Sequence, residues 1–444
     1  MAVNGGSDRP GAGPGAGGPG AGGDDYCTRV YADESDSVFE PNEVVRLDLE
    51  MSEADWQFQL DNPDLEEYRP VDVTFCGEVI ATVGLRFKRS TWRGGGGAVA
   101  HLDPGYPKNP IVLDINEFVP GQRLRGLRKL NLEYGNDGLI VAQRINFEML
   151  ADHGVTVSRV NYADVYMNGD FLGVFINIER VDRSYANYHW GENDGQLYKH
   201  AYCGTFQWNG SAATDYYDGP QYDGNPTDPR CYSPKPSDSQ TDFADLIRVI
   251  DVLNHSGADL ESAFPAVWNV DEWIEMMAGL QVIPYGDSPN ANGNNFYTYF
   301  PPAGPARVAL WDLDAGYWNT GAPCESGADI IGWDLTRIAT CHRGGLPLFD
   351  NVLAVDGWRR HYFEAARRFL DGPFDSDRFA LRVDSLAAQL AGSLARDPNR
   401  RSGALGEEET GDLDEDLALG LDRLRRTQRA RAEAVEGQLA DLGY

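Results

Sequence analysis

The chain has 444 residues and a formal net charge of −31. A surface this acidic repels phosphate backbones and anionic lipids, so the composition argues against nucleic-acid and membrane-surface binding. Hydrophobic residues make up 42% and aromatic residues 11%, which is enough for a large core in two or three structural units. The acidity otherwise indicates solubility, a salty habitat, or attraction of metal ions or basic substrates.

The first 25 residues form a Gly/Pro/Ala tract that has no apolar segment of the kind found in signal peptides. This composition predicts a disordered linker over 1–25, such as follows a removed export signal or lipid anchor. No run of about 18 apolar residues occurs, so no transmembrane segment is expected.

The six cysteines include no C-x-x-C pair, which argues against a zinc ribbon or a thioredoxin-type motif. Cys203 with Cys231, and Cys324 with Cys341, bracket stretches rich in Gly, Pro, Asp and Ser. We expect disulfides, with these pairings as a guess, and therefore an oxidising extracytoplasmic compartment. Six buried free thiols are the alternative.

Residues 26–200 are expected to form a β-rich N-lobe. Asn168-Gly169 lies between two alternating apolar runs, which is a strong hairpin signal. Leu139–His153 has helical periodicity and is followed by Gly154, a typical C-terminal cap. Ser52 is a plausible N-cap for a helix start at Glu53. The predicted strands are 44–49, 71–75, 79–86, 111–115, 128–132, 161–167 and 171–178.

Residues 201–240 form an irregular insertion that suggests a lid or substrate loop. A mainly helical C-lobe is expected over 241–444. The predicted helices are 242–253, 271–280, 346–353, 357–370, 376–394 and 417–439, interrupted by strands at 296–300 and 306–311. The fold class is therefore α+β, and a β-rich lobe followed by a mainly helical lobe matches the two-lobed plan of kinases.

The polar residues around the two C-lobe strands could carry phosphoryl transfer. Asp287 starts a polar loop that ends at Asn295, and Trp311 leads into Asp312-Leu313-Asp314. In kinases one Asp orients the acceptor hydroxyl, while an Asn and a second Asp hold the metal ions on the phosphates. The alternative is that these Asn- and Asp-rich loops are simply turns.

Taken together, these segments resemble the CotH kinase family, the spore coat protein H group of atypical protein kinases. The family pattern is an Asp, a polar loop, an Asn-aromatic-Tyr-x-Tyr strand, and then Trp-Asp-x-Asp. Here these elements are Asp287, Asn295–Tyr299 and Trp311–Asp314. The runs 126–132 and 164–173 are also family-like, and the resemblance covers about 45–400.

The resemblance implies a secreted kinase that transfers the γ-phosphoryl group of ATP to Ser or Thr of a protein substrate, with Mg²⁺ or Mn²⁺. It implies that Asp287 is the catalytic Asp and Asp312 the main metal ligand. Asn295 is the expected amide ligand, with Asn292 or Asn294 as alternatives. Asp314 is either a second metal ligand or a residue that shapes the turn or caps a helix.

A kinase also needs a cation over the phosphates and a helix Glu that orients it. Lys129 is the candidate cation, with Lys108 as the alternative. Glu148 is the candidate orienting residue, unless it is a solvated helix Glu. The family's loop rich in Asn and Ser is replaced here by Arg93 and the glycine run 94–97.

Two other functions fit the same scaffold. Some family members are associated with spore coats or with adhesion at cell surfaces, so one alternative is a non-catalytic binding or structural protein. The other is nucleotidyl transfer from ATP. The sequence contains no Walker loop, no Gly-x-Ser-x-Gly elbow and no His-Glu-x-x-His helix, which argues against those chemistries.

Overall fold

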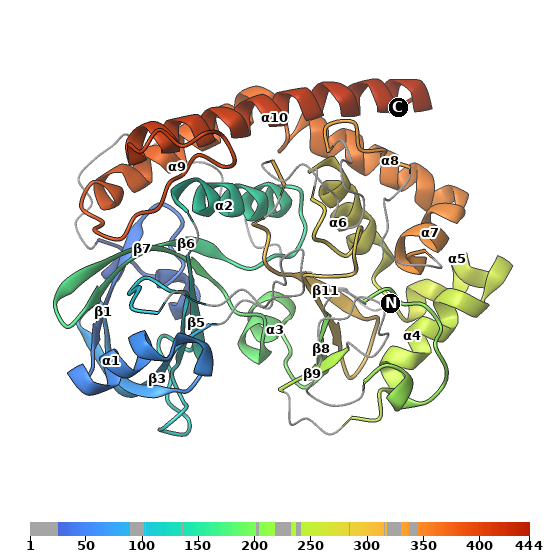
Figure 1. Ribbon diagram of the computed structural model, residues 1–444. Helices are drawn as coiled ribbons and strands as arrows, with labels where there is room; N and C mark the ends of the chain where they lie inside the picture. The colour runs from blue at the N-terminus through green and yellow to red at the C-terminus, as the bar shows by residue number, and fades with distance from the viewer. Residues whose placement is uncertain are drawn as a thin grey trace.

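The computed structural model shows a mixed α/β protein with one large sheet and a smaller second sheet. It describes residues 25–88, 102, 104–134, 136–200, 204–217, 232–236, 241–283, 285–314, 316–317, 330–336 and 345–444. Figure 1 shows the large sheet on the left, the second sheet at the lower centre and most helices above and to the right.

The large sheet closes into a barrel with strand order β1-β2-β3-β4-β5-β7-β6. β1 runs parallel to β6, and this pairing closes the barrel, whereas the other neighbours are antiparallel. Inward apolar side chains of these strands, among them Leu47, Val73 and Leu130, fill the barrel. The strands are β1 (Val44–Glu50), β2 (Arg69–Phe75), β3 (Glu78–Phe87), β4 (Ile111–Asp114), β5 (Lys129–Glu133), β6 (Val160–Met167) and β7 (Asp170–Ile178).

Local signals account for several of these elements. Asn168 and Gly169 have φ angles of 52° and 89° between β6 and β7, as the expected two-residue hairpin requires. The hydroxyl of Ser52 accepts a hydrogen bond from the amide of Asp55, which caps α1 (Glu53–Asp61). The seven strands expected before residue 180 are all present, with ends shifted by at most two residues.

The second sheet has the order β11-β10-β8-β9. Its strands are β8 (Gln196–His200), β9 (Ser233–Lys235), β10 (Phe296–Phe300) and β11 (Arg307–Leu310). β8 pairs with β10 across almost a hundred residues of sequence. Residues 196–200, expected in the N-lobe, therefore belong to the second sheet, because β8 pairs with a strand of the helical part and not with the barrel.

The helices pack around and between the two sheets. In Figure 1, α3 lies between the barrel and the second sheet, and α10 runs along the top of the molecule. The remaining helices are α2 (Asp137–Asp152), α3 (Arg183–Trp190), α4 (Ala244–His255), α5 (Leu260–Ala263), α6 (Val270–Val282), α7 (Pro347–Ala354), α8 (Asp356–Asp371), α9 (Ser376–Leu394) and α10 (Leu413–Leu442). Short 3₁₀ helices occur at Asp25–Cys27, Glu34–Ser37 (η2), Pro63–Leu65, Ala213–Asp215, Gly257–Asp259 and Phe264–Ala266.

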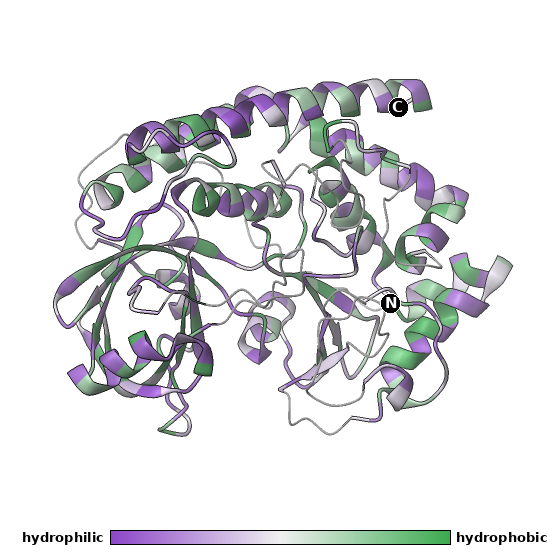
Figure 2. Cartoon of the chain, viewed as in Figure 1, coloured by the Kyte–Doolittle hydropathy of each residue, from purple (hydrophilic) through white to green (hydrophobic). Residues whose placement is uncertain are grey.

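The hydropathy of the helices agrees with packing on a water-exposed surface. Figure 2 shows both hydrophilic and hydrophobic residues along the whole of α10, the longest helix described. No helix in the described part of the chain combines the length and the apolar character needed to cross a membrane.

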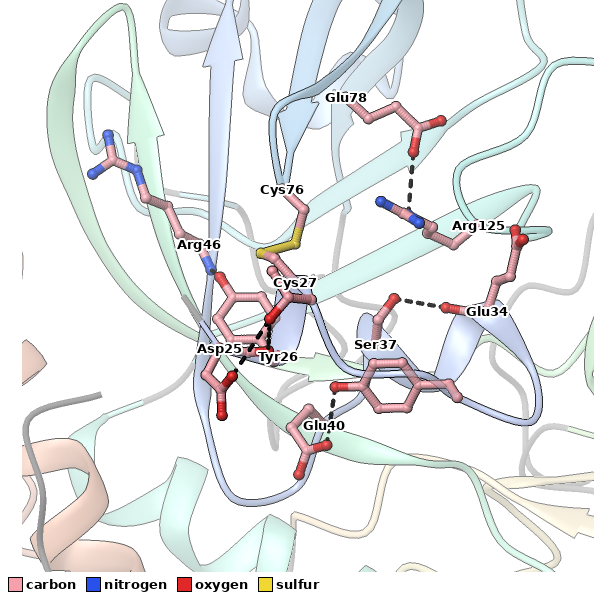
Figure 3. Close-up of a disulfide and its surroundings, with 12 residues drawn as sticks. Asp25, Tyr26, Cys27, Glu34, Ser37, Glu40, Arg46, Cys76, Glu78 and Arg125 are labelled. Atoms are coloured by element: carbon pink, nitrogen blue, oxygen red, sulfur yellow. Dashed lines mark hydrogen bonds and ion pairs between the residues drawn. A yellow bond between two sulfur atoms is a disulfide. The ribbon is translucent and has the colours of Figure 1, made fainter. Parts of the chain in front are cut away.

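A disulfide joins Cys27 to Cys76 (Figure 3). Cys76 and Gly77 form the turn between β2 and β3, so the bond fastens the segment before β1 to the barrel. The expectation of disulfides is therefore met at this pair. The four cysteines for which pairings were guessed lie outside the described residues: Cys203, Cys231, Cys324 and Cys341.

Candidate functional site

The hairpin of β10 and β11 brings the polar residues of two segments together. Phe296 pairs with Leu310 at the end of the hairpin, so Asn295 and Trp311 are neighbours where the strands leave the sheet. The amide of Trp311 donates to the carbonyl oxygen of Asn295 at 2.9 Å. Asp312 therefore follows beside the polar loop that begins at Asp287.

Three asparagine amides hold the carboxylate of Asp287. Oδ1 accepts hydrogen bonds from Nδ2 of Asn292 at 2.5 Å and of Asn294 at 2.9 Å. Oδ2 accepts a bond from Nδ2 of Asn295 at 3.0 Å. Asn292 and Asn294, expected as alternative metal ligands, thus direct their amide nitrogens to Asp287. The Asn-rich loop fixes the position of this carboxylate.

The backbone of the site is held in an uncommon conformation. Asn295 and Asp312 have φ angles of 60° and 56°, and Asn and Asp are the side chains that best tolerate this left-handed region. The hydroxyl of Tyr285 donates to the carbonyl oxygen of Asp312. Such conformations persist where the surrounding contacts fix them, and they concentrate at functional sites.

Gly293 allows the polar loop to approach a second segment closely. A Cβ at this position would lie 2.9 Å from the backbone nitrogen of Gly204, and the φ angle of Gly293 is 69°. The same nitrogen of Gly204 donates to the carbonyl oxygen of Gly293 at 3.0 Å. A larger residue at 293 would therefore displace the loop that positions Asp287.

The carboxylates of the site repel one another. Burial raises the pKa of Asp314 well above its usual range, and the nearby charges of Asp312 and Asp287 raise it further. Burial also raises the pKa of Asp287; the amides of Asn292 and Asn294 oppose this rise, while Asp312 adds to it. A cation bound among these groups would relieve the repulsion.

Residues 311–314 are called the acidic segment below. Helix α2 contacts this segment through a residue other than Glu148, the one expected from the sequence. Nδ2 of Asn146 donates to the carbonyl oxygen of Leu313 at 3.0 Å. Glu148 instead forms ion pairs with Arg144 at 2.8 Å and with Arg382 on α9 at 3.4 Å. The helix therefore braces the acidic segment, while Glu148 joins α2 to α9.

The two lysines expected beside the phosphates have their own carboxylate partners. Lys129 forms an ion pair with Asp114, its neighbour across β4 and β5. Lys108 is fully buried and forms an ion pair with Asp397 at 2.5 Å. Within the described residues neither lysine forms an ion pair with the acidic segment, and the glycine run 94–97 lies outside those residues.

A third lysine lies beside the acidic segment. Nζ of Lys88, directly after β3, forms an ion pair with Glu133 at the end of β5 and lies 5.0 Å from the ring centre of Trp311. Burial lowers the pKa of Lys88, but the carboxylates of Glu133 and Asp312 raise it more, so the net pKa is above its ordinary value. Lys88 and Glu133 thus form a lysine–glutamate pair whose lysine is close enough to Asp312 to be affected by its charge.

The sequence reasoning missed Lys88 and Glu133, although each carries a local signal. Lys88 follows the predicted strand 79–86 by two residues and precedes the glycine run 94–97, and kinases cover the phosphates with a glycine-rich loop. Glu133 directly follows the predicted strand 128–132. Charged residues at strand ends beside that loop were therefore better candidates than Lys129, which lies at the opposite end of its strand.

A group of three cations, Arg180, Lys199 and Lys235, continues from this region along the second sheet. Lys199 pairs across the strands with Tyr297, and its Nζ lies 5.9 Å from the ring centre. Lys235 is diagonal to Lys199 on the same face. Burial, and then the charges of Lys199 and Arg180, lower the pKa of Lys235 to about 8. We call these three residues the cationic group.

The cationic group reaches from the second sheet to the barrel. Nη1 of Arg180 donates to Oδ1 of Asn131 on β5 at 3.4 Å. Lys199 and Lys235 make no ion pair with any described residue, although the chain is strongly acidic. No described carboxylate therefore balances their charges on the face of the sheet that carries Tyr297, a residue that also affects the pKa of Lys88.

The donor set of the acidic segment suits a hard divalent cation. Asp312 and Asp314 offer carboxylates. Asn295 directs its Nδ2 to Asp287, so its Oδ1 is the atom that could bind a metal. Mg²⁺ commonly uses one or two protein carboxylates and leaves its other positions to water and phosphate oxygens. No group of three or more His, Cys, Asp or Glu side chains in the described ranges could hold a metal ion by itself.

A mixed α/β fold in which an acidic segment lies beside an ion-paired lysine is the arrangement of kinase-like proteins. The chain belongs to the CotH kinase family, because the family model described as CotH kinase protein matches residues 105–423. The resemblance inferred from the sequence is therefore confirmed, with a match that begins later and ends later than expected. No curated protein sequence matches the chain.

Proposed function

We propose that the protein is a metal-dependent protein kinase that transfers the γ-phosphoryl group of ATP to a Ser or Thr hydroxyl. One observation carries the proposal: Nζ of Lys88, ion-paired with Glu133, lies 5.0 Å from the ring centre of Trp311, the residue before Asp312, in the site where three asparagine amides hold Asp287. Kinases require this combination of a phosphate-directed lysine, its glutamate partner, a metal-binding Asp and a hydroxyl-orienting Asp.

The residues divide the chemistry as follows. The acceptor oxygen attacks the γ-phosphorus, the bond to the β,γ-bridging oxygen breaks, and the hydroxyl proton passes to Oδ of Asp287. The asparagine bonds keep that carboxylate oriented, and its raised pKa makes it a better proton acceptor than an ordinary Asp. Asp312, Asp314 and Asn295 would hold Mg²⁺ or Mn²⁺, which would neutralise charge on the phosphates.

The cationic group supports a place for the nucleotide between the barrel and the second sheet. Lys88 would lie at the phosphate end, and Arg180, Lys199 and Lys235 would attract the anion along the face that carries Tyr297. A bound anion would remove the repulsion that lowers the pKa of Lys235. The protein substrate itself has no assigned surface in this proposal.

We further propose that the protein acts outside the cytoplasm, secreted or attached to the cell envelope. The Cys27–Cys76 disulfide supports this location, because such bonds persist in oxidising compartments. The net charge of −31 further argues against nucleic acid as a partner.

The test is incubation of the purified chain with ATP labelled at either the γ- or the α-phosphate, with Mg²⁺ or Mn²⁺ and with protein acceptors. We expect label on Ser or Thr from the γ-position only, and none with the Asp287→Asn variant. Label from the α-position would indicate nucleotidyl transfer instead. A native protein that labels nothing from either position would favour a non-catalytic binding protein.

The proposal predicts which lysine serves the phosphates. Lys88→Met should lower kcat/KM for ATP roughly 10²-fold, because a positioned charge that faces the transferred phosphoryl group is lost. Lys129→Met is the matched control, because it also removes one lysine charge from the barrel. Lys129 pairs with Asp114, so its loss should change kcat/KM by less than about threefold. Steady-state kinetics of both variants measure the difference. Equal losses, or a greater loss for Lys129→Met, would contradict the assignment of Lys88.

A further inference from the structure

A cavity of about 390 Å³ lies away from the acidic segment. It is bounded by η2, by the loop before β5 and by the start of α3, and five of the residues around it are arginines. We call it the arginine pocket. Its arginines are Arg123, Arg125, Arg128, Arg159 and Arg183.

Two of the five arginines have carboxylate partners. Arg159 pairs with Asp36 at 2.8 Å and with Glu179 at 2.6 Å. Arg125 pairs with Glu78 at 3.1 Å, and Figure 3 shows this pair beside the disulfide.

The other three guanidinium groups make no ion pair with a described residue. Arg123 donates to the backbone oxygen of Gln122 at 2.7 Å, and Arg183 is exposed at the start of α3. Nη2 of Arg128 bonds to the side-chain oxygen of Asn116 at 3.2 Å, whereas its Nε is buried and has no hydrogen-bond partner. A buried donor without a partner is costly, and a ligand oxygen would satisfy it.

The acidic residues near the pocket are already engaged. Oδ1 of Asp33, which lines the pocket, accepts hydrogen bonds from the amide and the hydroxyl of Ser35 at 2.9 and 2.5 Å. Asp36 accepts a hydrogen bond from the hydroxyl of Tyr188 at 2.7 Å as well as its bond from Arg159. These carboxylates shape the wall, and among the described residues none of them forms an ion pair with Arg123, Arg128 or Arg183, so arginines outnumber carboxylates around the cavity.

We propose that the arginine pocket binds a small ligand that carries one or more phosphoryl groups. Guanidinium groups form paired hydrogen bonds with phosphate oxygens, and several around one cavity favour a multiply charged oxyanion. The volume lies in the range of small-molecule sites. The ring of Tyr188, which Arg159 covers at 3.6 Å, offers an apolar surface to the rest of the ligand.

The arginine pocket is separate from the site of phosphoryl transfer. None of the residues that line it belongs to the acidic segment, to the Lys88–Glu133 pair or to the cationic group. Loss of the transfer site should therefore leave binding in the pocket intact.

Equilibrium dialysis with labelled inorganic pyrophosphate, at low salt and with EDTA, tests the proposal on the full chain. The double variant Arg123→Gln/Arg183→Gln should bind pyrophosphate roughly tenfold more weakly or worse, because two charge-assisted contacts are lost. Arg128→Lys keeps the charge but loses the forked donor, and it should also bind more weakly than the native protein. Arg183→Gln alone, at an exposed position, gives the same direction of change with little risk to folding.

The control is Arg248→Gln/Arg378→Gln, which changes the net charge equally at two exposed positions on α4 and α9. This control and Lys88→Met should both keep the native affinity within about twofold. Native affinity in Arg123→Gln/Arg183→Gln would overturn the proposal. So would a native protein that binds no pyrophosphate, or loss of binding in Lys88→Met.

Discussion

Asp312→Asn is expected to lower the rate of phosphoryl transfer by about 10³-fold or more, equivalent to about 4 kcal/mol of transition-state stabilisation. The residue follows Trp311 at the end of the hairpin, where its carboxylate faces Asp287 and Asp314 and acts on Lys88. Asn is the suitable replacement, because it tolerates the φ angle of 56°, whereas Ala would add backbone strain.

The variant separates a chemical role from a structural one. An amide oxygen is a weaker ligand than a carboxylate, so a high concentration of Mn²⁺ should restore part of the lost rate. Asp377→Asn, at an exposed position in the first turn of α9, controls for the change in net charge and should keep native kinetics. Native transfer rates in Asp312→Asn, or transfer that continues in EDTA, would exclude the proposed role of Asp312.

Much of the fold and the acidic segment could be predicted because their signals are local. Asn168-Gly169 specifies its own turn, and Ser52 specifies its own helix start. Asp287 and Asn295 lie in one short loop, and the next hairpin leads directly to Asp312. Antiparallel pairing of neighbouring strands then fixes where these residues meet, without reference to the rest of the chain.

The partners of the charged residues could not be predicted in the same way. Lys88 and Glu133 are 45 positions apart, and Lys108 and Asp397 are 289 positions apart. Such pairs depend on strand order and on how the last helices return to the barrel. Lys129 illustrates the difficulty, since its partner is set by the register of β4 with β5, which strand patterns alone leave open.

The distribution of charge refines what the composition indicated. The net charge of −31 argues against binding of anionic polymers. Yet cations without an ion-pair partner among the described residues are concentrated in the cationic group and in the arginine pocket. A group of like charges sets the electrostatic potential in its own neighbourhood. The local charge therefore decides where small phosphate ligands bind, even on a protein whose net charge is negative.

Lys108→Met is expected to destabilise the protein by about 3–5 kcal/mol, because it leaves the buried carboxylate of Asp397 without its cation. Asp397 also accepts hydrogen bonds from the amides of Val174 at 3.0 Å and Asn399 at 2.8 Å. It thereby ties the segment after α9 to strand β7. Urea unfolding of the variant, compared with Lys129→Met, measures the loss; the side chain of Lys129 is 28% exposed whereas that of Lys108 is fully buried, so Lys129→Met should destabilise the protein less.

Two further measurements distinguish this structural role from a role in binding ATP. Lys108→Met/Asp397→Asn should recover part of the lost stability, because the carboxylate charge disappears together with the ammonium group. At temperatures where Lys108→Met remains folded, its KM for ATP should equal that of the native protein. A variant of native stability that no longer binds ATP would show the opposite: that Lys108 is the phosphate-binding lysine and that its ion pair with Asp397 is dispensable for folding.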